Sequence, residues 1–111
     1  MPDTMADRRI APRYPVILIA QVQGLNGEKK FSARTSDISR TGCYVDTLTP
    51  LPKGSSILIR LMRLEEVFEA KGTVMYISPG LGMGVRFEEP MPASQVAVLE
   101  NWLERAAKQS E

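Results

Sequence analysis

The sequence predicts a mainly β protein, namely a six-stranded antiparallel β-barrel with one C-terminal α-helix. Three observations support this fold class. The length of 111 residues suits one domain. Six short segments rich in β-forming residues are separated by turn residues. Near Pro92 the hydrophobic period changes from two residues to about 3.6. We expect the sheet to close on itself, because closure removes exposed strand edges.

Each predicted strand follows from β-branched residues or from alternation of apolar and polar residues. In the fifth strand, Phe68, Ala70, Val74 and Tyr76 form the expected inward face, and Gly72 suggests a bend or bulge. The predicted strands span residues 16–22, 29–35, 43–48, 57–63, 67–77 and 82–88.

The last segment is expected to form one amphipathic helix. Its apolar residues recur at helical spacing, with Pro92 or Ser94 as alternative starts and an end near Lys108. The apolar stripe consists of Val96, Leu99, Leu103 and Ala106, with Trp102 beside it.

Composition excludes several classes of function. The net charge of +1 is too small to indicate non-specific binding of DNA or RNA. The chain lacks histidine, which excludes a Ser-His-Asp or Cys-His nucleophile and argues against a metal site, so no enzyme activity is predicted. The single cysteine, Cys43, is expected in the core and fits a reducing cytoplasm. We find no signal peptide and no segment for membrane insertion.

Two short segments carry the polar chemistry. Asp37 to Gly42 (Asp-Ile-Ser-Arg-Thr-Gly) is predicted to form a tight turn after the second strand. In it Asp37 and Ser39 offer hydrogen-bonding groups, and Gly42 suits a positive φ or a close approach of ligand to backbone. Near the N-terminus, Arg8, Arg9 and Arg13 lie in an extended segment, because Ala11 precedes a proline. Either segment alone is also compatible with an ordinary turn or a solvated tail.

Together the two segments resemble the PilZ domain family. Arg9 and Arg13 match its Arg-x-x-x-Arg element, and Asp37, Ser39 and Gly42 match its Asp-x-Ser-x-x-Gly element. The resemblance covers roughly residues 8–105 and implies the same barrel with a helix. It also implies binding of cyclic di-GMP as a ligand, without any cofactor. We therefore expect a disordered N-terminus at 1–7 and a single PilZ-like domain at 8–108.

The ligand brings two phosphodiesters and two guanines, and the chain has matching groups. Arginine binds phosphate in pairs and stacks on purines, and Asp37 suits the N1–H and N2–H donors of guanine. Arg8, as an additional guanidinium, favours two ligands bound as an intercalated dimer. Further ligand contacts are predicted, less directly, for Arg34, Arg40 and Arg86. Residues 8–13 have little apolar surface that could pack against the barrel. We therefore expect them to become ordered only when ligand binds.

Three functions remain open at this point. The first is a non-enzymatic second-messenger receptor that signals in trans to an unidentified effector protein. The second is a ligand-independent interaction module on the same fold, as in pilus assembly. The third, an oligonucleotide-binding barrel, would require stacking aromatic residues on a basic face, whereas the seven aromatic residues are scattered.

Overall fold

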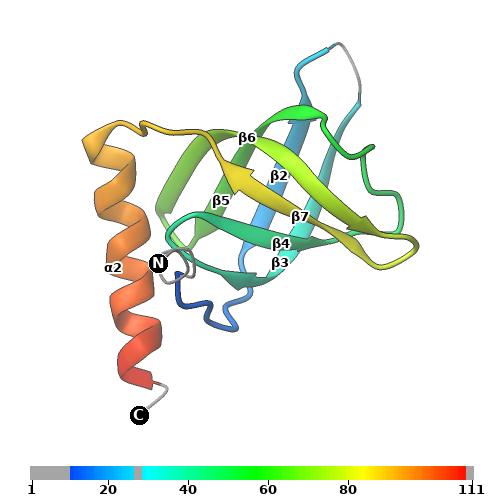
Figure 1. The fold of residues 1–111 in the computed structure, drawn as a ribbon. Helices are drawn as coiled ribbons and strands as arrows, with labels where there is room; N and C mark the ends of the chain where they lie inside the picture. Colours follow the sequence, from blue (N-terminus) through cyan, green and yellow to red (C-terminus); the bar gives the residue numbers. More distant parts are fainter. Residues whose placement is uncertain (1–10, 27–28, 110–111) are drawn as a thin grey trace, which may run out of the picture.

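The computed structural model describes residues 11–26 and 29–109, and the segment 1–7 expected to be disordered lies outside them. The predicted fold class is confirmed: six antiparallel strands close into a barrel in the order β2-β3-β4-β7-β6-β5, followed by one helix (Figure 1). The elements are β2 (Ile19–Gly24), β3 (Lys30–Ile38), β4 (Gly42–Asp46), β5 (Ser56–Arg63), β6 (Glu66–Ser78), β7 (Gly82–Phe87) and α2 (Ala93–Gln109).

The first strand begins later than residue 16, the start expected from sequence. The hydroxyl of Thr35 donates to the carbonyl of Val16 at 2.8 Å and accepts from the backbone N–H of Leu18 at 2.9 Å. The buried Thr35 side chain therefore forms hydrogen bonds with backbone groups that would otherwise pair within the β-sheet. Regular pairing of β2 with β3 and β5 starts at Ile19.

The second strand is longer than expected and includes Asp37 and Ile38. A register shift between Thr35 and Asp37 interrupts its pairing with β4, and the ladder then continues through Ile38 opposite Cys43. The predicted six-residue turn is therefore only three residues long, 39–41, and Gly42 already belongs to β4.

The inward face expected for the fifth strand is correct for Phe68, Ala70 and Val74, which are buried, but wrong for Tyr76, which is 49% exposed. The register of β6 against β7 shifts between Val74 and Tyr76. Because side chains alternate with a period of two, this shift turns Tyr76 outward. The irregularity predicted at Gly72 therefore lies further along, between Val74 and Tyr76.

Helix α2 stands against one side of the barrel and packs on β6 (Figure 1). Leu99, Trp102 and Ala106 are buried, and the rings of Trp102 and Phe68 meet edge to face at 6.5 Å. The backbone N–H groups of Gln95 and Val96 donate to the carbonyl of Pro92, so the helix starts just after this proline. Within the described ranges, no helix has the length and apolar character needed to cross a bilayer.

Candidate functional site

The turn between β3 and β4 is organised by Ser39. Its side chain is buried, and its Oγ accepts from the backbone N–H groups of Thr41 and Gly42, each at 3.2 Å. The Ser39 backbone N–H donates to the carbonyl of Gly42 at 2.8 Å. This hydroxyl therefore shapes the turn, which is the local role that serine commonly takes.

Gly42 is required by a close approach of two strands. Its φ is not positive, since Gly54 and Gly80 are the glycines with positive φ among the described residues, so that part of the expectation is wrong. A Cβ at Gly42 would instead collide with the backbone carbonyl of Val85 on the paired strand β7. The glycine thus lets the turn lie flat against β7.

Arg13 and Asp37, which come from the two sequence elements, are in direct contact. The Arg13 Nη2 lies 2.6 Å from Asp37 Oδ1. The adjacent residue Tyr14 forms a two-bond bridge with Ile38, with N···O distances of 2.9 and 3.0 Å. The C-terminal end of the arginine segment is therefore attached to β3. Residues 8–10 lie outside the described residues, so the expectation that ligand binding orders residues 8–13 stays a prediction.

A groove with a volume of about 350 Å³ runs beside this pair on the outer face of β4, β7 and β6. Arg13 and Arg86 give it positive charge, and the ring of Tyr76 lies over Gly84, where any Cβ would collide with it. Tyr44 covers Gly82 in the same way, and its ring centroid lies 6.1 Å from that of Tyr76. The groove is lined by Arg13, Thr41, Gly42, Cys43, Met75, Tyr76, Gly84, Val85 and Arg86.

The remaining predicted arginines lie in different surroundings. Arg86 is exposed in the groove. Arg34 lies 3.5 Å from Asp46 across the β3–β4 pair, and the side chain of Arg40 is held by Glu89 and Glu100. Neither Arg34 nor Arg40 lines the groove. Arg8 and Arg9 lie outside the described residues.

The buried residues beside the site are structural. Cys43 is buried as expected, and burial, with a smaller contribution from the Asp37 charge, raises the pKa of its thiol to about 12. The thiol is therefore protonated at neutral pH and a poor nucleophile. Trp102 is also buried as expected.

Sequence reasoning missed the part that Tyr76 plays in lining the groove, because it assigned this residue to the interior. The available signal was the pair Gly82 and Gly84 in one strand, because glycines spaced by two leave a flat strip on one face that an aromatic ring from a neighbouring strand can cover.

Comparison with solved structures places this fold among PilZ domains. The PilZ domain of YcgR from Escherichia coli with c-di-GMP has 18% identity and a TM-score of 0.73, with coverage of 93% of this chain and 94% of that chain. The Bacillus subtilis inhibitor of motility MotI/DgrA has 19% identity and a TM-score of 0.73 (100% and 55% coverage). The Borreliella burgdorferi PlzA protein in complex with c-di-GMP has 15% identity and a TM-score of 0.66 (87% and 41% coverage).

Among curated proteins, none matches the chain. The profile of the PilZ domain family, in contrast, matches residues 7–105, which is most of the sequence and includes both the arginine segment and the turn. The protein therefore belongs to the PilZ domain family.

Proposed function

We propose that the protein is a non-enzymatic receptor for cyclic di-GMP that binds this ligand in the groove beside the Arg13–Asp37 pair. The single observation that carries the proposal is the contact between these two side chains at the edge of a positively charged groove. Family membership and the c-di-GMP complexes of the YcgR and PlzA neighbours support it.

The chemistry of the groove suits a cyclic dinucleotide. Arg13 and Arg86 can pair with phosphate oxygens. Arg8 and Arg9, which lie outside the described residues, precede Arg13 in the sequence and are proposed as further phosphate ligands. Asp37 accepts from the donor edge of guanine, and the exposed ring of Tyr76 offers a stacking surface. The purine therefore has both an edge contact and a face contact.

Binding at this position requires an exchange of partners. The Arg13–Asp37 pair is solvent-accessible, with side-chain exposures of 46% and 32%, so separating it costs at most about 1 kcal/mol. Two charge-assisted contacts to the ligand outweigh this cost, since each contributes about 1.5–3 kcal/mol.

Ser39 and Gly42 act in this proposal chiefly by building the turn. Ser39 holds the backbone of Thr41 and Gly42 in place, and Gly42 keeps it close to β7. The floor of the groove next to the turn is then open to the ligand. The receptor would pass the signal in trans to an effector protein through the surface that changes on binding.

The test is a calorimetric titration of the purified protein with cyclic di-GMP, with GTP and cyclic di-AMP as controls. We expect saturable binding of cyclic di-GMP that is clearly tighter than binding of either control. Absence of binding would refute the receptor proposal and favour the ligand-independent interaction module instead.

Replacement of Arg13 gives the first specific prediction. Arg13→Ala should weaken cyclic di-GMP binding by about ten- to a hundredfold, because a charge-assisted phosphate contact is lost. Arg9→Ala should have an effect of the same order. Arg60→Ala is the matched control, because Arg60 also pairs with a carboxylate, Glu69 at 3.0 Å, but lies outside the groove on β5. Equal affinities of the Arg13 and Arg60 variants would contradict the proposed site.

A further inference from the structure

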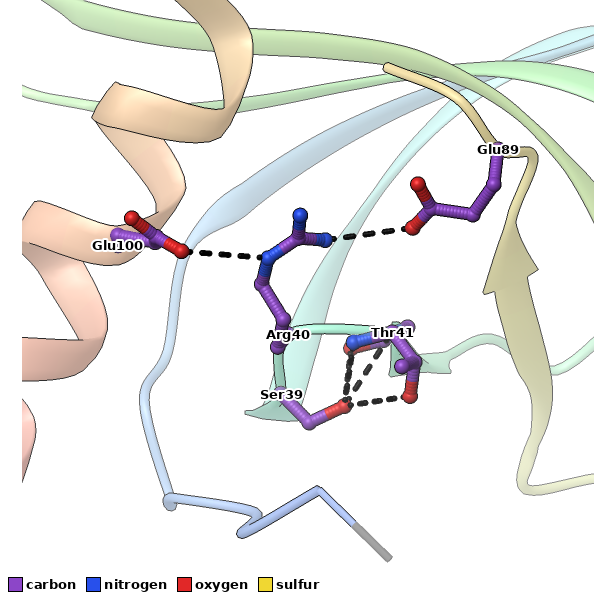
Figure 2. A network of polar contacts seen from close by, with 6 residues as sticks. Ser39, Arg40, Thr41, Glu89 and Glu100 are labelled. Atoms are coloured by element: carbon purple, nitrogen blue, oxygen red, sulfur yellow. Dashed lines mark hydrogen bonds and ion pairs between the residues drawn. The ribbon is translucent and has the colours of Figure 1, made fainter. Parts of the chain in front are cut away.

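Arg40, at the centre of the β3–β4 turn, is bound by two carboxylates from outside the turn. Its Nη1 lies 3.2 Å from Glu89 Oε2, and its Nε lies 3.4 Å from Glu100 Oε2. Glu89 follows β7 and Glu100 lies on α2. Figure 2 shows the Arg40 side chain directed away from the Ser39–Thr41 hydrogen bonds and toward these two carboxylates. The guanidinium of Arg40 therefore connects the turn both to the residues that follow β7 and to the middle of α2.

The backbone of Arg40 lies at a boundary between two grooves. The next two residues, Thr41 and Gly42, line the candidate ligand groove, whereas Arg40 itself lines a second groove along α2 with Glu100 and Glu104. The N-terminal segment shows the same division, because Arg13 faces the ligand groove while its two neighbours, Pro12 and Tyr14, face α2. The side chain of Arg40 is thus on the α2 side, one residue from the ligand site.

We propose that the bound ligand competes with the carboxylates of Glu89 and Glu100 for the guanidinium of Arg40. Ligand binding then breaks the polar link between the turn and α2. This inference rests on the proposed function. In this proposal Arg40 makes the ligand contact expected from sequence, but only after its ion pairs with Glu89 and Glu100 have broken.

The partners of Arg40 are well suited to such an exchange. The side chains of Arg40, Glu89 and Glu100 are 35%, 52% and 61% exposed, and ion pairs this accessible to water are weak. A phosphodiester next to the turn offers oxygens that a guanidinium binds in pairs and with better geometry. The exchange therefore trades two weak contacts for a stronger one.

Thermodynamic reciprocity gives the proposal a measurable consequence. If ligand weakens the Arg40–carboxylate link, removal of the link must strengthen ligand binding by the same factor. The exchange also leaves Glu89 and Glu100 without their guanidinium, so the surface beside α2 becomes more acidic when ligand is bound. This is a change that a partner protein can detect.

The experiment compares Glu100→Gln with Glu104→Gln by calorimetry with cyclic di-GMP. Both variants remove one negative charge from α2 and from the same groove, but of the two carboxylates only Glu100 has an ion pair with Arg40 among the described residues. We expect Glu100→Gln to tighten binding by about two- to fivefold relative to Glu104→Gln, the size of an exposed ion pair. Glu89→Gln should act in the same direction as Glu100→Gln.

A double-mutant cycle assigns the effect to Arg40. Arg40→Gln should weaken binding, and in that background Glu100→Gln should have no more effect than Glu104→Gln. Equal affinities of the Glu100 and Glu104 variants, or weaker binding by Glu100→Gln, would overturn the exchange while leaving the receptor proposal intact. A wild-type protein that binds no cyclic di-GMP would overturn both proposals.

Discussion

Arg13 and Asp37 are predicted as separate ligand contacts, yet in the structure each is the partner of the other. The affinity for a ligand is therefore a difference between new contacts and this existing one. A substitution of either residue therefore changes both the ion pair and the contact with the ligand. For Asp37 the two effects have opposite signs, because its loss removes a base contact and also frees Arg13 for phosphate.

For this reason base discrimination is a better measure of Asp37 than affinity alone. We expect Asp37→Ala to reduce the preference for cyclic di-GMP over cyclic di-AMP by about ten- to a hundredfold, the value of a hydrogen bond to a charged group. Competitive titrations of both dinucleotides measure this ratio. Asp46→Ala is the control, since Asp46 on β4 also pairs with an arginine, Arg34 on β3. An unchanged ratio in Asp37→Ala would show that this carboxylate does not read the base.

Residue identity predicts what Asp37 and Arg13 can bind, but not what they contact in the free protein. That contact depends on the bridge between Tyr14 and Ile38, which places the N-terminal segment alongside β3. Nothing in the local sequence indicates such an isolated bridge next to Pro15. Similarly, Ser39 is recognisable as a turn residue, whereas the burial of its side chain is visible only in the structure.

At the level of elements, α2 is attached to the barrel by a polar cluster as well as by its apolar face. The Trp102 indole donates to Glu66 Oε1 at 2.9 Å, and Arg105 lies 3.2 Å from Glu66 Oε2. The hydrogen bond from Trp102, followed by the charge of Arg105, lowers the pKa of Glu66. Ionised Glu66 is thus favoured in the folded protein over the unfolded chain.

This cluster predicts an acid-dependent loss of stability. Because the folded pKa of Glu66 is lower than the unfolded one, its contribution is present above the ordinary glutamate pKa and is lost as the pH falls through the lowered value. Glu66→Gln should therefore be less stable than wild type near neutral pH, and the difference should shrink in acid. Urea unfolding at several pH values measures this. Glu65→Gln, one residue away in the turn, is the matched control for the loss of one carboxylate.

The elements themselves follow closely from sequence, and their errors have local causes. Alternation and turn residues predict all six strands, and the change of period predicts the helix. The start of β2 is shifted because the Thr35 side chain replaces ladder bonds, and the outward position of Tyr76 follows from a register shift. Both depend on how one strand pairs with its neighbour, so the pattern within a single strand does not reveal them.

For the whole molecule, charge sets how many ligands can bind. Positive charge is concentrated near the N-terminus, where residues 1–40 hold seven Lys or Arg against four Asp or Glu. Two stacked cyclic di-GMP molecules carry four negative charges, and Arg8, which lies outside the described residues, adds a third guanidinium to Arg9 and Arg13. Binding of two ligands therefore requires more positive charge from the N-terminal segment than binding of one ligand.

We accordingly predict two ligands per chain in wild type and a ratio approaching one in Arg8→Leu. Calorimetric stoichiometry distinguishes these values, with Arg60→Leu as a variant of equal charge change on β5. A ratio of one in both wild type and Arg8→Leu would exclude the intercalated pair without affecting the assignments of Arg13 and Asp37.

The closed order of the strands also limits how other proteins can recognise this domain. A partner cannot join the described sheet by adding a strand, because β2 and β5, the ends of an open sheet, are paired with each other. Recognition must then depend on side chains displayed on the barrel wall and on α2. Such a surface can be altered by single substitutions without changing any backbone pairing.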